Sequence, residues 1–416
     1  MLDNFGLGFV ICRSKVFQNK MQPLAMVRSA LSTVALVLTV GVGLLLGCQD
    51  NAVGPDSETN REDDPSVMAF PESTATGAVD REQLRLCDNI VWKTDLIQDV
   101  VNEAESGAVL CVFPGTYEEQ IVVDESVTVR GLTPPTSGAP VVIEGWVSLE
   151  AEGAALRRVR VTREEPFSTP GSFTPDPFGV RVRASNTVVA RTVVRGIGEP
   201  VQDGSINGIQ VFGETPLSNV RVEDNIVRDY RNADDEGTPV SGVAGIKIQA
   251  DVSDVVVAGN SVRDLHGAFG FGVVITTSAS ADGTPKNVLV EENTLAGIND
   301  GSVFNVFRGP NNGRDAVPLP GSAVGLEADA AEATVRYNDL LAPNGAESKD
   351  ADRSLTARCN WWGDRSGPTD DENPRGQGTW VLERNDAEIE YTPWLTAPSP
   401  LRFCFGGKKS APRGGE

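Results

Sequence analysis

The chain has 416 residues and a formal net charge of −22, with one histidine and six cysteines. This charge disfavours binding to nucleic acid, which needs cationic contacts with phosphates. One histidine argues against a zinc site built from imidazole ligands. Lysines number 8 against 28 arginines, and this acidic, lysine-poor composition resembles that of salt-adapted proteins. An ordinary acidic secreted protein is the alternative.

Residues 1–47 have the pattern of a secretory signal peptide, since Arg28 precedes an apolar stretch over 29–47. Met21 or Met26 would be the true start, because residues 1–20 are long for a basic leader region. The phrase Leu45-Leu-Gly-Cys48 resembles a bacterial lipobox, which implies lipidation of Cys48 and a membrane anchor. An uncleaved transmembrane helix is the alternative. Both interpretations place the body outside the cytoplasm, at the cell envelope, outer membrane or cell surface.

Residues 48–85 are rich in Asp, Glu, Ser, Thr and Pro and contain almost no aromatic residues. Such a segment cannot bury enough apolar surface to fold, so we expect a disordered tether. Residues 86–400 form the predicted folded body, and residues 401–416 a flexible tail. At the start of the body, residues 94–106 place apolar side chains at helical spacing, with Thr94 or Asp95 as N-cap and Gly107 as the stop. We expect this short helix to cap the first coil of a repeat structure.

A two-strand phrase recurs through the body: a glycine followed by alternating apolar residues, and then Val-x-x-Asn before an apolar pair. The Asn spacing varies, so the strands are constant and the connections differ in length, as in a coil with loops inserted at its turns. The recurring Asn fits a turn, where its amide tolerates left-handed backbone, and stacked amides would form an internal ladder. Ordinary antiparallel hairpins are the alternative. The glycine and the Asn of the four full copies are Gly208 and Asn225, Gly245 and Asn260, Gly272 and Asn293, and Gly325 and Asn338; a degenerate copy reads Gly179-Val-Arg-Val-Arg and then Asn186-Thr-Val-Val.

These repeats resemble right-handed parallel β-helix proteins of the pectin-lyase-like type. The segment from Val112-Phe-Pro-Gly115 to Gly131 is similar to the first coil of pectin methylesterases and of periplasmic β-helix proteins that mature nitrous-oxide reductase. The phrases Cys359-Asn-Trp-Trp-Gly363 and Tyr391-Thr-Pro-Trp-Leu395 resemble a closing segment of such proteins. The resemblance implies an all-β fold: a single-stranded, right-handed parallel β-helix solenoid.

Four cysteines fall within the predicted body and its tail: Cys87, Cys111, Cys359 and Cys404. An even number outside the cytoplasm permits disulfides, with three connectivities. The pairs Cys87–Cys111 and Cys359–Cys404 would each close one end of the coil. We expect no metal site from the cysteines, because no Cys-x-x-Cys or His–Cys cluster occurs.

One outward strip is the candidate binding site. The residues between the inward valines and isoleucines after the repeat glycines would stack in one column: Arg181, Arg183, Gln210, Phe212, Lys247 and Gln249. Arginine binds carboxylates with two parallel bonds, and amides match sugar hydroxyls. The strip therefore suits an acidic or hydroxyl-rich polysaccharide, although ordinary solvated outer residues are the alternative.

Four long insertions, residues 163–178, 196–207, 231–244 and 299–322, would border this strip, and loops of this length are often functional. Their carboxylates could act as acid and base, or hold Ca²⁺ through oxygen ligands; no other cofactor is expected. Trp361, Trp362 and Trp394 are expected to pack as a C-terminal cap, with a sugar-stacking platform as the alternative.

The catalytic phrases of the resembled enzymes are absent: Gly-x-x-Asp-Phe-Ile and Leu-Gly-Arg-Pro-Trp of pectin methylesterases, Asn-Thr-Asp and Gly-His-Gly of polygalacturonases, and Trp-Ile-Asp-His of pectate lyases. His266 lies in Asp-Leu-His-Gly, which fits a turn rather than a base. We therefore expect a monomeric, membrane-anchored protein that binds or scaffolds polysaccharide without cleaving it. A polysaccharide lyase or glycoside hydrolase acting on acidic glycans is the alternative.

Overall fold

The computed structural model describes residues 84–132, 140–162, 177–196, 205–232, 241–277, 282–299, 321–326, 333–349, 354–384, 386–398 and 404. All of them belong to one compact unit, within residues 62–416. The predicted signal segment, Cys48, nearly all of the tether and the tail other than Cys404 lie outside the described residues. Among the described residues, no helix is long and apolar enough to cross a membrane.

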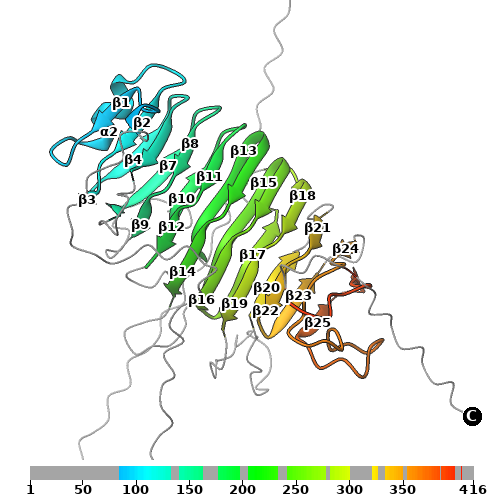
Figure 1. Cartoon of the computed structure of the whole chain (residues 1–416). Coiled ribbons are helices and arrows are strands. Elements are labelled where there is room, and N and C mark those ends of the chain that lie inside the picture. Colours follow the sequence, from blue (N-terminus) through cyan, green and yellow to red (C-terminus); the bar gives the residue numbers. More distant parts are fainter. Residues whose placement is uncertain are drawn as a thin grey trace, which may run out of the picture. The chain divides into compact units, whose positions relative to one another are not determined.

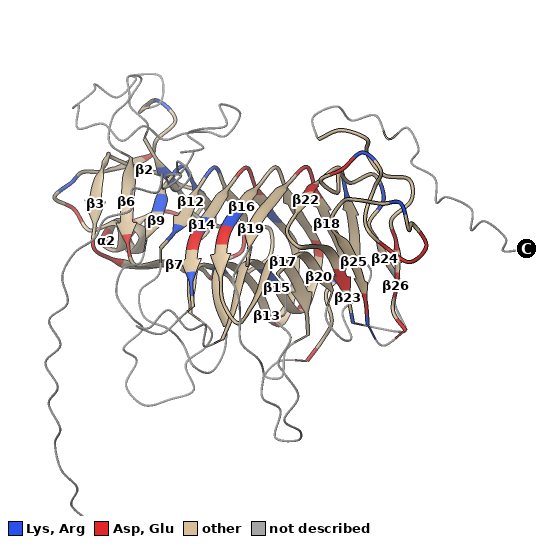
Figure 2. Ribbon diagram, turned by 90° about the horizontal axis from the view of Figure 1, so that it is seen from below, with Lys and Arg blue, Asp and Glu red and all other residues tan. Residues whose placement is uncertain are grey.

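The chain winds as a right-handed parallel β-helix, so the predicted fold class is confirmed. Each full coil contributes one strand to each of three faces, in the order face 1, face 2, face 3 along the chain (Figure 1). All paired strands run parallel, and the antiparallel-hairpin alternative is wrong. Figure 2 shows the strands of face 3 in front.

The strands of face 1 are β4 (Gln120–Val123), β7 (Trp146–Leu149), β10 (Phe178–Val182), the first parts of β13 (Ser205–Glu223) and β15 (Gly242–Ala258), β17 (Phe269–Thr276), β20 (Ser322–Leu326), β23 (Asn344–Ser348) and β25 (Trp380–Glu383). Those of face 2 are β1 (Asn89–Val91), β2 (Val109–Val112), β5 (Thr128–Gly131), β8 (Ala155–Arg157), β11 (Val188–Ala190), the second parts of β13 and β15, β18 (Lys286–Glu291), β21 (Ala333–Arg336), β24 (Ser354–Thr356) and β26 (Glu388–Glu390). Those of face 3 are β3 (Gly115–Tyr117), β6 (Val141–Glu144), β9 (Arg160–Thr162), β12 (Val193–Arg195), β14 (Ile226–Arg231), β16 (Ser261–His266), β19 (Thr294–Ile298) and β22 (Asp339–Leu341).

The interior is a column of stacked aliphatic side chains. On face 1, the residues predicted to point inward have no exposed surface, and they include Val180, Ile209 and Ile246. These three lie in register on neighbouring strands. The alternation of apolar and polar residues therefore assigned the inner and outer sides of face 1 correctly.

Three of the four repeat glycines, Gly208, Gly245 and Gly272, lie where face 1 meets the side chains of face 3. The alignment of the fourth was wrong, because Gly325 is in register with Val274 on the outer side and Ala323 takes the position equivalent to Gly272. A Cβ atom on Gly208 would lie 2.3 Å from a methyl group of Val227, and one on Gly245 would lie 2.2 Å from a methyl group of Val262. Any larger residue would collide with the core valine of its own coil. Close packing across the interior therefore explains why glycine recurs at this point of the repeat.

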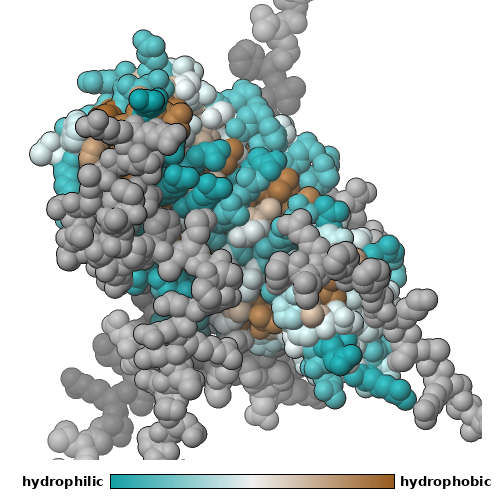
Figure 3. All heavy atoms as spheres, viewed as in Figure 1, coloured by the Kyte–Doolittle hydropathy of each residue, from teal (hydrophilic) through white to brown (hydrophobic). Residues whose placement is uncertain are grey.

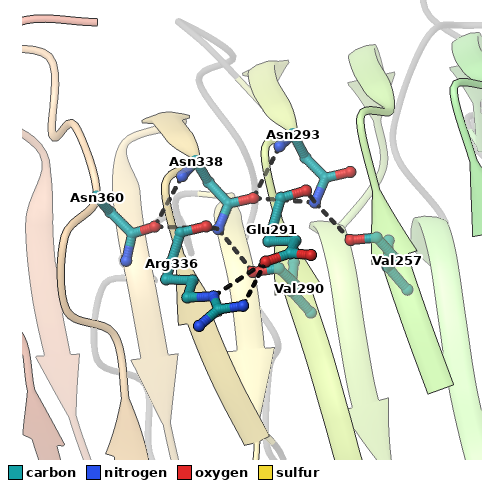
Figure 4. Close-up of polar contacts among 7 residues, drawn as sticks. All are labelled: Val257, Val290, Glu291, Asn293, Arg336, Asn338 and Asn360. Carbon is teal, nitrogen blue, oxygen red and sulfur yellow. Dashed lines mark hydrogen bonds and ion pairs between the residues drawn. The ribbon is translucent and has the colours of Figure 1, made fainter. Parts of the chain in front are cut away.

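The recurring asparagines form the predicted internal ladder between faces 2 and 3 (Figure 4). The backbone and side-chain N–H groups of Asn260 both donate to Oδ1 of Asn293, at 2.8 and 2.9 Å. Asn293 makes the same two bonds to Asn338. Each ladder amide also donates to a face 2 carbonyl oxygen, as Asn293 does to Val257. The ladder runs through Asn225, Asn260, Asn293, Asn338 and Asn360.

Two details of the turn prediction are wrong. The left-handed residue is the one before each ladder asparagine, for example Asp224 and Glu292, with φ of 53° and 60°. The ladder asparagines keep ordinary backbone because their amides must point inward. Asn186 belongs to a different turn, between faces 1 and 2, where Asn219 donates to its exposed amide oxygen at 2.7 Å.

The N-terminal helix is α2, Ile97–Glu103, which is shorter than the predicted 94–106. Ile97 and Val101 are fully buried against the first coils. The predicted caps are wrong, because the N-cap is Leu96 and the C-cap is Ala104. The backbone N–H groups of Ile97 and Gln98 donate instead to the carboxylate of Glu119, at 2.9 and 3.0 Å.

Two disulfides join the cysteine pairs named above. Cys87 and Cys111 are linked near α2, and Cys359 is linked to Cys404 at the C-terminal end. There Trp362 and Trp394 are buried with Tyr391, at ring-centroid distances of 6.2 Å. Buried rings cannot offer a face to a sugar, so these two tryptophans act as a packed cap.

We predict that Asn293→Ala lowers stability more than Asn219→Ala does. The first change removes the acceptor of two buried N–H groups of Asn260, at a cost of about 1–3 kcal/mol per unsatisfied group. The second removes an exposed bond and places alanine at a left-handed residue, with φ of 57°, so it should cost about 1 kcal/mol. Thermal and urea unfolding, followed by circular dichroism, would measure both. Equal losses would contradict the structural role of the internal ladder.

Candidate functional site

The outer side of face 1 differs from an ordinary solvated sheet surface, because several of its polar side chains are buried. Arg181 is 7% exposed, Gln210 3% and Glu347 4%. Register places these residues in one central row: Ser148, Arg181, Gln210, Lys247, Val274, Gly325 and Glu347. On one side runs a second row, of Phe178, Asn207, Ala244, Phe271, Ser322 and Asn344, and on the other a short third row, of Phe212, Gln249 and Thr276.

The predicted strip residues therefore lie together, but their polar groups are bonded to one another. The guanidinium of Arg181 lies 3.8 Å above the ring of Phe178. Its Nε donates to Oε1 of Gln210 at 2.9 Å, and Nε2 of Gln210 donates to Oε1 of Gln249 at 3.4 Å. One polar chain thus crosses three consecutive coils.

The other two cations of the strip also have partners. Arg183 forms ion pairs with Glu150, at 3.7 Å, and with Glu214. Nζ of Lys247 donates to Oγ of Ser205 at 3.2 Å. The strip is therefore a preorganised polar surface rather than a row of solvated cations.

An apolar cluster follows in the middle of face 1. Ala244, Phe271 and Val274 are buried on its outer side, and Phe269 packs against them. The Phe269 and Phe271 rings meet edge to face, with centroids 6.4 Å apart. In Figure 3, the apolar atoms among the described residues form small separate patches on a mostly hydrophilic surface.

Beyond this cluster lies a carboxylate that the repeat phrase did not identify. Oε2 of Glu347 accepts a 2.6 Å hydrogen bond from the hydroxyl of Ser322, and Oε1 accepts a 2.8 Å bond from Nε of Arg384. Nζ of Lys349 lies 3.7 Å from the same Oε1 and 5.5 Å from the centre of the Phe271 ring. Glu347 comes from a coil without the repeat phrase, and only its register with Gly325 reveals its position.

Face 3 carries a row of arginines whose side chains are partly exposed to solvent. Arg195, Arg228 and Arg263 lie in register, and their side chains are 38%, 32% and 42% exposed. Arg195 and Arg228 lie 3.6 Å from Asp229, and Arg263 lies 3.9 Å from Asp264. These charges, visible on β14 and β16 in Figure 2, are surface ion pairs of little energetic weight.

The predicted Ca²⁺ ligands cannot be placed. Within the described residues, no group of three or more Cys, His, Asp or Glu side chains could hold a metal ion. The loop carboxylates that suggested Ca²⁺, Asp203, Asp234, Asp235, Asp300 and Asp315, lie outside the described residues. Those loops join strands of face 3 to strands of face 1. His266 ends β16 on face 3, and its backbone carbonyl accepts from Asn232.

We predict that Glu347→Ala destabilises the protein by about 2 kcal/mol, because it leaves Ser322 and the cations around it without their buried acceptor. The control is Glu390→Ala, whose partner is the exposed Arg358 and whose loss should cost about 0–1 kcal/mol. Urea unfolding at matched salt would compare them. A loss at Glu347 no larger than that at Glu390 would show that the buried carboxylate is not a fixed element of face 1.

No family model matches the chain, and no curated protein matches it. Among solved structures, pectate lyase Pel9A aligns over 75% of this chain and 82% of its own, at 11% identity and a TM-score of 0.37. YbhC of Escherichia coli aligns over 79% and 89%, at 12% identity and a TM-score of 0.34. The pectin methylesterase from carrot aligns over 79% and 91%, at 8% identity and a TM-score of 0.34. Identities and TM-scores this low assign no activity to this chain.

Proposed function

We propose that the protein is an extracytoplasmic, membrane-anchored β-helix protein that binds an acidic polysaccharide along the outer side of face 1 without cleaving it. One observation carries the proposal. Buried amides, a buried guanidinium and aromatic rings lie in register on this face over consecutive coils. The three arginines of the face 3 row are 32–42% exposed, and none is buried as Arg181 is.

The chemistry of face 1 suits a linear sugar polymer. The amide of Gln249 is only partly buried, and an amide can both donate to and accept from hydroxyl groups. The buried Gln210 and Phe178 hold the polar groups around them in place rather than contact the ligand. Coils repeat every ~4.8 Å, so equivalent groups recur along the solenoid as they do along a polymer.

The cations of this face supply the attraction for acidic groups. With a net charge of −22, the protein repels a polyanion at long range, and binding needs local positive groups. Arg181, Arg183, Lys247, Lys349 and Arg384 all project from the outer side of face 1 or from its edge. The carboxylate partners of Arg183, Lys349 and Arg384 would be replaced by carboxylates of the ligand, so we expect retention to weaken as salt is raised.

Cleavage of the polymer is the second candidate function, and the Glu347 cluster favours it. A lyase removes a proton beside a carboxylate while a cation offsets the developing charge, and Lys349 and Arg384 flank the site. A hydrolase needs two facing carboxylates. In the described C-terminal half of the central row, only Glu347 supplies one.

We predict that the triple variant Arg181→Ala, Arg183→Ala, Lys247→Ala loses most of its retention on affinity gels carrying pectin, alginate or sulfated glycans. The matched control is Arg195→Ala, Arg228→Ala, Arg263→Ala, which removes the same charge from face 3 and should bind as the unmodified protein does. Circular dichroism would verify folding, and Lys247→Gln alone tests the site if the triple variant unfolds.

Retention that is equal in both triple variants, or absent from the unmodified protein, would overturn the proposal. Release of reducing ends, or of unsaturated uronate measured by absorbance, would show that the protein cleaves the polysaccharide and does not only bind it. That activity should then be lost in Glu347→Gln and Lys349→Ala.

The anchor rests on the lipobox-like phrase before Cys48. We predict that Cys48→Ser moves the protein from the membrane fraction to the soluble fraction and abolishes incorporation of labelled fatty acid, because only a thiol at this position can accept the lipid. Cys12→Ser is the control, since Cys12 precedes the apolar stretch. Membrane retention of Cys48→Ser without label would favour an uncleaved transmembrane helix instead.

A further inference from the structure

Face 2 carries a hollow of about 400 Å³ near the N-terminal end, separate from the face 1 rows. Its lining is Leu86, Val109, Thr128, Arg130, Arg157, Arg158 and Arg191. Four of these seven residues are arginines, and none is acidic. On a chain with 58 acidic and 36 basic residues, such a group is the reverse of what composition predicts.

The coil stacking brings the four arginines together. Arg130 in β5 and Arg157 in β8 lie directly opposite each other on neighbouring strands. Arg158 and Arg191 occupy equivalent left-handed turn positions in successive coils, with φ of 57° and 54°. In later coils the same turn position holds Asp224, Gly259 and Glu292, so the arginines at this position are specific to the N-terminal coils.

The positive charge in the hollow is poorly compensated. Within the described residues, no carboxylate forms an ion pair with Arg130, Arg157 or Arg158, and Arg191 lies 3.6 Å from Asp224. Like charges directly opposite on neighbouring strands are destabilising. Burial, together with the charges of Arg130, Arg191 and Arg157, lowers the pKa of Arg158. The free protein therefore carries an electrostatic cost here.

A residue farther along the same outer column shows the usual arrangement. Arg336 in β21 lies in register with Glu291 in β18 and pairs with it at 2.8 Å (Figure 4). The N-terminal coils instead place arginine opposite arginine. A bound anion in the hollow would supply the counter-charge that Glu291 supplies to Arg336.

We propose that Arg130, Arg157, Arg158 and Arg191 bind one sulfate or phosphate group, either as the free ion or as an ester of a larger molecule. Each guanidinium offers five N–H donors in a planar fork, and Thr128 adds a hydroxyl. A tetrahedral oxyanion presents more acceptor oxygens to four forks than a carboxylate does. The site lies on face 2, so it does not depend on the polysaccharide proposal for face 1.

The test is isothermal titration of the full-length protein with sodium sulfate and sodium phosphate, against sodium acetate at constant ionic strength. We expect saturable binding of sulfate or phosphate, and at least tenfold weaker binding by Arg157→Gln, Arg158→Gln. Arg336→Gln is the matched control and should bind as the unmodified protein does. No saturable binding, or equal binding by the double variant, would overturn the proposal.

Thermal melting adds a readout that a purely structural role would not give. Without anion, the double variant should melt at the same or a higher temperature, because like charges are removed. Sulfate should raise the melting temperature of both proteins, because salts of this kind are excluded from protein surfaces. The increase should be larger for the unmodified protein, because it also binds the ion. A double variant that melts lower without anion would overturn the electrostatic argument.

A competition experiment distinguishes a free ion from an ester as the natural ligand. Glycerol phosphate and a sulfated disaccharide should displace inorganic sulfate if the natural ligand is an ester, and only the free ions should bind if it is not. Glycan retention by face 1 should be unchanged in the double variant, which separates this site from the face 1 proposal.

Discussion

The fold depends on one constraint: every coil must lie in register on the next, so that each strand bonds to its parallel neighbours. The asparagine ladder enforces this register from inside. Each ladder residue before Asn360 donates its backbone N–H and its amide to the following asparagine, and it also donates to a carbonyl of face 2, as Asn260 does. A shift by one residue would break these bonds and turn the aliphatic column outward.

Register also decides what the surface can do. Because parallel stacking sets equivalent residues about 4.8 Å apart, side chains separated by more than 20 residues along the chain become neighbours. On face 1 this produces connected amides, a guanidinium over an aromatic ring and a buried carboxylate. On face 2 it collects four arginines around one hollow. Both surfaces concentrate cations on an acidic protein, so position rather than net charge governs what each face can bind.

The sequence predicted the features that repeat. Alternating apolar residues and the recurring asparagine and glycine were sufficient for the fold, the inner residues and the ladder. The helix caps could not be predicted, because Glu119, which holds the N-terminus of α2, lies more than 20 residues away in another coil. The left-handed residues were misassigned because the asparagine is constant in the repeat, whereas the residue before it varies.

The candidate sites were only partly predictable for the same reason. The repeat glycines precede Arg181, Gln210 and Lys247, so these three residues could be aligned from the sequence alone. Glu347 and the four arginines of face 2 belong to coils without the full phrase, so their alignment requires the actual strand pairing. The partners of Arg181 and Arg183 were also invisible in the sequence, since hydrogen bonds between coils depend on side-chain reach.

The most direct test of the account is a set of distances along one face of the solenoid. Spin labels could be placed in pairs at Thr128 and at Arg221, Thr334 or Glu390, which share one outer column of face 2. These partners are three, six and eight coils away, so the account predicts separations near ~14, ~29 and ~38 Å, before the label arms are added. Distances that fail to increase in these proportions would show that the coils do not stack in register, and the rows of face 1 and the hollow of face 2 would be lost with that register.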